Sequence, residues 1–260
     1  MPILFYIIIF ILGLVLGSFL NCIIYRLKED ESVLKGRSYC PHCGHTLAIQ
    51  DLIPLFSFLF LKGRCRYCER KISWQYPLVE LAMGIGLVVI AFFGLGVIES
   101  VFYSILWGLL LIIFVFDWRY MVVPDLITNA AIIITLGFSI WKTSLSGFWG
   151  VGSYLGNHLI AMLGAGLFFG FLHLITRKKG MGAGDIRIGL LMGLLLGIDK
   201  TIVALLISFV LGSIVGIILI AFSDRHMKSK VPFAPFLIFG TVVSLLGGQY
   251  LINWYLQLLL

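Results

Sequence analysis

The sequence predicts an all-α polytopic membrane protein with about eight transmembrane helices and one small cytoplasmic loop domain. Hydrophobic residues make up 60% of the 260 residues and charged residues only 12%, which is about half the charge of an average soluble domain. Apolar runs of about 20 residues, the length that crosses a bilayer as a helix, recur along the chain. Four of the five cysteines and nine of the nineteen lysines and arginines, by contrast, lie between residues 26 and 74.

The first predicted span covers residues 3–24. It lacks a basic leading region and a small-residue cleavage site, so we expect a retained helix and not a removed signal peptide. Small and polar residues at 17–21 favour packing against another helix, with Asn21 as an interhelical hydrogen-bond donor. Seven further spans are predicted at 76–98, 101–116, 125–141, 154–176, 185–198, 201–223 and 232–254. The chain then divides into a first transmembrane helix (1–25), a tetra-cysteine domain (26–75) and a seven-helix membrane core (76–260).

The basic residues predict an orientation in the membrane. With eight spans and an outside N-terminus, seventeen of the nineteen lysines and arginines fall in cytoplasmic segments, and only Lys142 and Lys200 stay outside. Such an excess follows the positive-inside rule. Both termini then face outward, while Asp117, Asp185 and the tetra-cysteine domain face the cytoplasm. The net charge of +7 is explained by this topology, and no basic stripe with interleaved aromatics indicates a nucleic-acid partner.

Two Cys-x-x-Cys pairs, with 21 residues between them, predict a metal site in the loop domain. Four thiolates at this spacing suit a closed, tetrahedral, structural Zn²⁺ site of the zinc-ribbon kind. The ligands would be Cys40, Cys43, Cys65 and Cys68. A redox pair is the alternative, and disulfides are not expected in a reducing cytoplasm. His42 and His45 could substitute as ligands, whereas Cys22 fits a buried apolar thiol in the first span.

Two aspartates at predicted helix ends are the candidate catalytic residues. Asp117 follows an apolar run, and Asp185 closes a Gly-Ala-Gly-Asp sequence and opens the next run. Two carboxylates within a few ångströms share one proton, so that one can activate water while the other polarises a peptide carbonyl. Gly182 and Gly184 carry no side chain, so a substrate backbone could approach there. Neither a Gly-x-Ser-x-Gly elbow nor a His-Glu-x-x-His helix indicates another kind of hydrolase.

Simpler interpretations of these aspartates stay open. Asp185 could cap the helix that it begins, and Asp125 is interpreted as a cap, because Pro-Asp before an apolar run suits a helix start. Asp117 lies at the wrong end of its own helix for a cap. A proton-coupled transporter would also use buried carboxylates, although its site is expected near the membrane midplane. A zinc scaffold without catalysis would leave the Gly-Ala-Gly-Asp sequence unexplained.

Motifs along nearly the whole chain resemble those of the type IV prepilin leader peptidases. They occur at residues 17–21, 25–26, 37–43, 53–57, 63–68, 72–80, 117, 123–125, 182–185 and 232–237. Val123, where Ile or Leu is more usual, and Cys22, where Val is common, are small departures.

The resemblance implies an eight-helix aspartic protease of the Gly-x-Gly-Asp type in the bacterial cytoplasmic membrane, with Asp117 and Asp185 as the catalytic pair. Its substrates would be prepilins and pseudopilins, cleaved after a glycine at the cytoplasmic face. Many members also methylate the new N-terminal residue with S-adenosylmethionine. Glu80, at the start of the second span, is the candidate for binding this methyl donor; its alternative role is that of an interfacial acid at a helix N-terminus.

Overall fold

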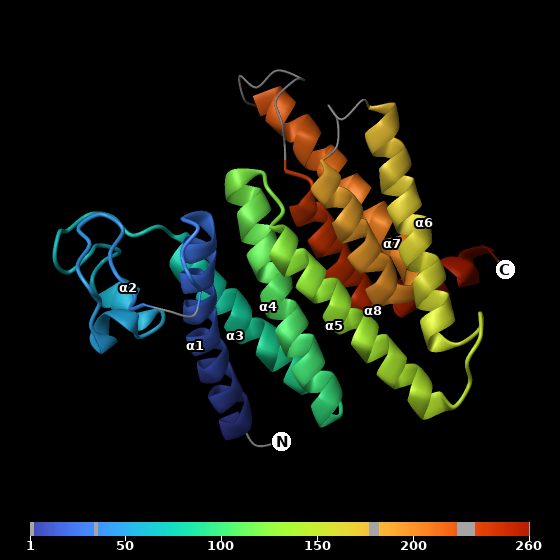
Figure 1. Cartoon of the computed structure of the whole chain (residues 1–260), viewed down its shortest axis with the longest axis horizontal. Helices are drawn as coiled ribbons and strands as arrows, with labels where there is room; N and C mark the ends of the chain where they lie inside the picture. Colours follow the sequence, from blue (N-terminus) through green and yellow to red (C-terminus); the bar gives the residue numbers. More distant parts are fainter. Residues whose placement is uncertain (1–2, 34–35, 177–181, 223–231, 260) are drawn as a thin grey trace. The chain divides into compact units, whose positions relative to one another are not determined.

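The structure, a computed structural model, describes residues 3–33, 36–176, 182–222 and 232–259 (Figure 1). These residues form α-helices, one short 3₁₀ helix and connecting loops, and within them the only β pairing consists of two isolated bridges. The chain divides into two compact units, Met1–Ile112 and Ile113–Leu260. Each unit is described by itself. The predicted basic loops at 177–179 and 224–230 lie outside the described residues.

The first unit contains the long helices α1 and α3 and the loop between them. Its elements are α1 (Ile3–Lys28), η1 (Ile49–Leu52), α2 (Phe56–Phe60), α3 (Gln75–Phe92) and most of α4 (Val97–Tyr120). The second unit contains the end of α4 and the helices α5 (Asp125–Ser146), α6 (Tyr154–Ile175), α7 (Ala183–Phe222) and α8 (Ala234–Leu259).

Seven of the described helices are long and apolar enough to cross a membrane. The sequence predicted about eight spans, and the difference lies in α7. Its 40 residues would measure about 60 Å as a straight helix, roughly twice the hydrocarbon thickness. The helix is broken at Gly197, whose φ of 73° and ψ of 178° are not helical. In Figure 1 both ends of α7 lie at the same end of the unit, so the chain reverses here and α7 supplies two of the predicted spans.

Contacts with α6 and α8 hold the break in α7. A positive φ suits glycine, which has no β-carbon to clash with the backbone. The amide of Asn157 in α6 accepts a hydrogen bond from the Ile198 backbone N–H at 2.9 Å, and the Thr201 hydroxyl donates to the Gly197 carbonyl. Ser244 of α8 donates to the carbonyl of Lys200. Polar groups freed by the break are therefore satisfied inside the protein, as a lipid environment requires.

Helices α1 and α3 pack closely in the first unit through glycines. A β-carbon at Gly13 would lie 2.6 Å from the Cα atom of Gly84, and one at Gly17 would lie 2.6 Å from the Cα atom of Glu80. Small residues permit such approach, which drives helix association in membranes. The Asn21 amide donates a hydrogen bond to the Tyr76 carbonyl at 3.0 Å, which confirms its predicted role between helices.

Candidate functional site

Asp117 lies in the last turn of α4, which extends beyond the predicted end at residue 116. Its side chain is buried, and its Oδ2 atom accepts a hydrogen bond of 3.0 Å from the backbone N–H of Ala234, the first residue of α8. A helix N-terminus carries unpaired N–H groups and partial positive charge, and both favour a carboxylate. Asp117 of α4 therefore satisfies a backbone N–H group at the N-terminus of α8. The sequence did not predict this interaction.

Asp185 is the third residue of α7 and is also buried. Its Oδ2 atom accepts a hydrogen bond of 3.0 Å from the backbone N–H of Gly182, just before the helix. This bond satisfies an N–H group at the helix start, so the predicted capping role is present. Asp185 also interacts electrostatically with Asp117. Two carboxylates that are 68 positions apart in the sequence therefore lie within electrostatic range of each other in the second unit.

The two glycines before Asp185 have different surroundings. A β-carbon at Gly184 would lie 2.6 Å from the Cβ and Cγ2 atoms of Val123, in the turn between α4 and α5. Gly182 is exposed, and a β-carbon there would meet only ordinary contacts, the nearest at 3.6 Å from Oδ2 of Asp185. Gly184 therefore allows the start of α7 to approach the α4–α5 turn, whereas Gly182 leaves open space beside the carboxylate.

Asp125 is separated from the aspartate pair by its environment. It begins α5 and forms an ion pair with Arg187 of α7, and its side chain is 66% exposed. No side-chain cap hydrogen bond forms at this helix start, where Pro124 is the N-cap residue. The helix does start at Asp125, but the predicted capping role of this residue is wrong, because Pro124 is the N-cap residue. The side chain of Asp125 instead links α5 to α7.

The four cysteines of the loop domain come together as predicted. Their sulfur atoms all lie within 4.8 Å of one another, and the Sγ atoms of Cys40 and Cys68 are 3.9 Å apart. Sulfur atoms that hold Zn²⁺ at about 2.3 Å in a tetrahedron lie about 3.8 Å apart. The donor set and its spacing therefore fit a metal ion with four thiolate ligands. His42 and His45 do not belong to this group of described ligands.

Each Cys-x-x-Cys pair forms the same tight turn. The Cys40 N–H donates to the His45 carbonyl and the Cys65 N–H donates to the Arg70 carbonyl, both at 2.9 Å. The residue after each second cysteine has a left-handed backbone, Gly44 with φ of 70° and Glu69 with φ of 58°. Glycine adopts this conformation without cost, so the second turn is the more strained one.

The thiols of this cluster differ in how readily they ionise. Burial opposes ionisation of Cys40, but the backbone N–H groups of His42 and Cys43 lower its pKa to about 7. At Cys68 the Arg70 backbone N–H favours the thiolate, yet burial and the neighbouring thiols raise its pKa to about 11. A bound cation would remove this difference, because metal binding displaces the protons from all its thiol ligands.

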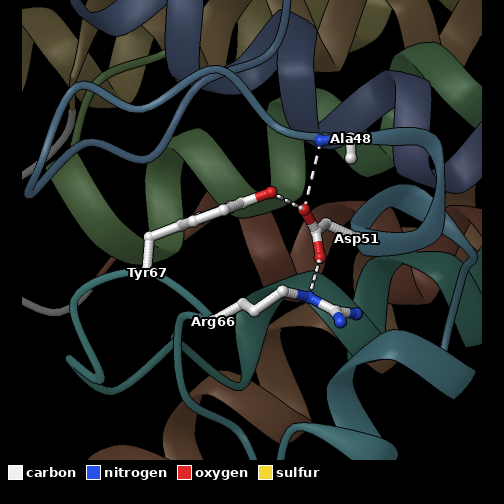
Figure 2. Close-up of polar contacts among 4 residues, drawn as sticks. All are labelled: Ala48, Asp51, Arg66 and Tyr67. Carbon is white, nitrogen blue, oxygen red and sulfur yellow. Dashed lines mark hydrogen bonds and ion pairs between the residues drawn. The ribbon is translucent and has the colours of Figure 1, made fainter.

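Asp51 connects the start of η1 to the second cysteine turn, and the sequence did not single it out for this role. Figure 2 shows its carboxylate between three donors from two segments of the loop domain. The Ala48 N–H and the Tyr67 hydroxyl donate to Oδ2 at 3.1 and 3.0 Å, and Nε of Arg66 donates to Oδ1 at 2.8 Å. Its side chain is only 4% exposed. Burial opposes the charge of Asp51, but Arg66 and the other donors outweigh it and lower the pKa of this carboxyl.

Glu80 lies inside the first unit and not at an exposed helix start. It is buried, its Oε2 atom accepts a hydrogen bond of 2.8 Å from the Leu55 backbone N–H, and it also hydrogen-bonds the Ser18 side chain. Leu55 precedes α2 and has a positive φ of 59°. Glu80 thus joins α1, α3 and the loop domain, and these contacts give it a structural role.

Comparisons with known proteins agree with this geometry. The family model described as the bacterial peptidase A24 N-terminal domain matches residues 11–93, and that of the type IV leader peptidase family matches residues 104–217. No solved structure matches. A protein of Aeromonas hydrophila named prepilin leader peptidase/N-methyltransferase is 32% identical over 98% of this chain and 95% of its own. A protein of Bacillus subtilis with the same name is 32% identical over 97% of this chain and 98% of its own. This chain therefore belongs to the type IV leader peptidase family.

Proposed function

We propose that this chain is a membrane aspartic endopeptidase that removes the leader peptide of type IV prepilins and pseudopilins after a glycine. It also methylates the new N-terminal residue, with S-adenosylmethionine as the methyl donor. The names of the full-length relatives support both activities. The observation that carries the peptidase proposal is that two buried aspartates from distant parts of the sequence lie within electrostatic range of each other in the second unit.

In this proposal Asp117 and Asp185 hold one proton between them. Each carboxyl is fixed through its Oδ2 atom by a backbone N–H, which leaves the Oδ1 atoms to work on water and substrate. The ionised aspartate takes a proton from water as the water attacks the scissile carbonyl. The protonated aspartate donates a hydrogen bond to the carbonyl oxygen and stabilises the charge that develops there. The proton that the first aspartate took from water then passes to the leaving amine as the carbon–nitrogen bond breaks.

The tetra-cysteine cluster holds a structural Zn²⁺ ion in this proposal. Four sulfur ligands close the coordination sphere, so the ion stabilises the loop domain and does not take part in hydrolysis. Glu80 is retained as a candidate for binding the methyl donor, although its two hydrogen-bond partners already explain its burial.

The proposed topology follows from the charges of the sequence. Both termini face outward, and the tetra-cysteine domain and the aspartates face the cytoplasm of a bacterial inner membrane. The chain then consists of a first helix (1–25), the tetra-cysteine domain (26–75) and a membrane peptidase core (76–260). A substrate would present its leader at the cytoplasmic face while its apolar helix stays in the bilayer.

The test uses purified full-length protein in detergent with a synthetic prepilin, followed by mass spectrometry with and without S-adenosylmethionine. We expect Asp117→Asn and Asp185→Asn each to lower cleavage by at least about 10³-fold, the loss typical of a missing acid–base group. Wild-type protein should cleave after the glycine and add about 14 Da, one methylene, when the methyl donor is present.

Asp125→Asn is the matched control. It removes a carboxylate near the same helix start, but one that is exposed and ion-paired, so cleavage should stay within about fivefold of wild type. Full cleavage by either Asp117→Asn or Asp185→Asn would refute the mechanism. Absence of cleavage by folded wild type on several prepilins would refute the peptidase assignment.

A further inference from the structure

The loop domain carries a group of exposed apolar side chains, called here the apolar patch. The patch consists of exposed side chains from η1, α2 and the turn between them: Ile49, Leu52, Ile53, Phe56, Leu59 and Phe60. Phe60 is 82% exposed and Ile49 is 85% exposed. The two helices contact each other, and the six side chains lie within one stretch of twelve residues. A domain in water rarely exposes such a cluster unless something covers it.

The backbone beneath the patch is suited to a medium with little water. In α2 the N–H groups of Ser57 and Leu59 donate to carbonyls four residues earlier, and the Gly63 N–H donates to the Phe58 carbonyl at 2.8 Å. The Leu55 N–H is satisfied by Glu80. Unpaired backbone groups are what prevents irregular segments from entering lipid. This segment can therefore enter the membrane surface without exposing such groups there.

The sequence of the patch is bounded by charge. Residues 52–61 include no charged residue, and Ser57 is the only polar one. This run is too short to cross a bilayer. Exposed basic residues follow it directly at Lys62 and Arg64, and residues 49–74 contain five lysines and arginines against two acids. Apolar side chains next to exposed cations are typical of segments that lie in the headgroup region of anionic membranes.

The helix α2, which carries half of the patch, also contacts the residue before the membrane-spanning helix α3 through its buried face. Phe58 packs on Trp74 with a ring separation of 4.9 Å, and Trp74 directly precedes α3. Trp74 is 69% exposed, at the kind of position where tryptophan marks a membrane–water interface. The Phe58–Trp74 contact therefore joins the element that carries the patch to the start of a membrane-spanning helix.

We propose that the apolar patch inserts into the headgroup region of the bilayer and holds the tetra-cysteine domain against the membrane. The occupant of the patch is anionic lipid. Phe56, Leu59 and Phe60 would lie among the upper acyl segments, with Lys62 and Arg64 at the phosphates. The domain then cannot swing freely in the cytoplasm, and its metal cluster stays at a fixed distance from the membrane surface.

Hydroxyl-radical footprinting of the full chain tests this proposal in nanodiscs of phosphatidylethanolamine and phosphatidylglycerol, without any prepilin. Tyr67 is the internal reference, because it is 41% exposed in the same domain, whereas Phe56 and Phe60 are 56% and 82% exposed. Corrected for intrinsic reactivity, the two phenylalanines should be modified at least about tenfold more slowly than Tyr67 if lipid covers them. Faster modification of the phenylalanines than of Tyr67 would overturn the proposal.

Photo-crosslinking identifies what covers the patch. Benzoylphenylalanine is placed at position 60 in one full-length variant and at the exposed Glu69 in a control variant, each checked for wild-type metal content. We expect lipid adducts at position 60 and at least about tenfold fewer at position 69. Crosslinks at position 60 to a second copy of the chain, or to added prepilin in preference to lipid, would assign the patch to that partner and overturn the lipid assignment.

Discussion

Replacing Gly184 by alanine tests whether the approach of α7 to the α4–α5 turn positions Asp185. The new β-carbon would lie 2.6 Å from both Cβ and Cγ2 of Val123, about 1 Å inside the distance at which carbon atoms attract. Forcing a methyl group into such a site costs about 1–3 kcal/mol. The start of α7 or the turn at Val123 must move by a similar distance, and Asp185 is the next residue. Because a 1 Å misplacement of reacting groups can cost about 100-fold, we expect kcat/KM for prepilin cleavage to fall about 100-fold.

Gly182→Ala is the matched control, since it adds the same methyl group two residues away. Its nearest contact would be 3.6 Å, from Oδ2 of Asp185, so the melting temperature and kcat should stay at wild-type values. Any loss should appear in KM, if the substrate backbone passes this glycine. Adding Val123→Ala to Gly184→Ala removes the Cγ2 contact and should restore part of the activity. Wild-type kcat/KM and melting temperature in Gly184→Ala would refute the packing argument.

Three further predictions concern the loop domain and the break in α7. The lowered pKa of Asp51 stabilises the fold above about pH 4, its ordinary range, and this contribution disappears as pH falls through the lowered value. Asp51→Asn should therefore melt at a lower temperature than wild type at pH 7, with a difference that shrinks on acidification; a pH-independent difference would contradict the role of its charge. Elemental analysis of purified protein should find that Cys43→Ser loses most of the bound metal. Cys22→Ser changes a cysteine outside the cluster and should retain the metal. Equal metal contents in the two variants would refute the four-cysteine site. Gly197→Ala places a β-carbon 2.8 Å from the Asn157 amide oxygen at a φ of 73°, so we expect about 1–3 kcal/mol of destabilisation, measured as a lower melting temperature; an unchanged value would show that the break has another conformation.

The parts of the site that follow from local spacing could be predicted from the sequence. Two Cys-x-x-Cys pairs can converge because each forms its own tight turn, and the structure brings the four sulfur atoms within 4.8 Å of one another. The apolar runs gave the helices, and the small residues near Asn21 indicated a helix contact that the structure confirms. These features depend on residues that are near one another along the chain.

The parts that were not predicted depend on partners far along the chain. The hydrogen bond between Asp117 and Ala234 joins residues 117 positions apart. No pattern in the sequence near either residue predicts it. In the sequence Asp51 is an ordinary acidic residue of a loop. Its role depends on hydrogen bonds from Arg66 and Tyr67, which lie at least 15 positions away. Glu80 was expected at the start of the second span as a methyl-donor ligand or an interfacial acid, and its bond to the Leu55 N–H in the loop before α2 was not predicted.

The glycine contacts between α1 and α3 have a consequence for how such a chain could change in evolution. Because these two helices meet directly through Gly13 and Gly17, their pairing does not depend on the long segment that connects them. That segment begins after Lys28, at the end of α1, and ends before Gln75, at the start of α3. It is therefore an insertion whose two ends are both fixed to one pair of packed helices. A short polar linker could replace this insertion while α1 and α3 stay packed together. Loop domains with new binding properties could equally be grafted between the same two positions.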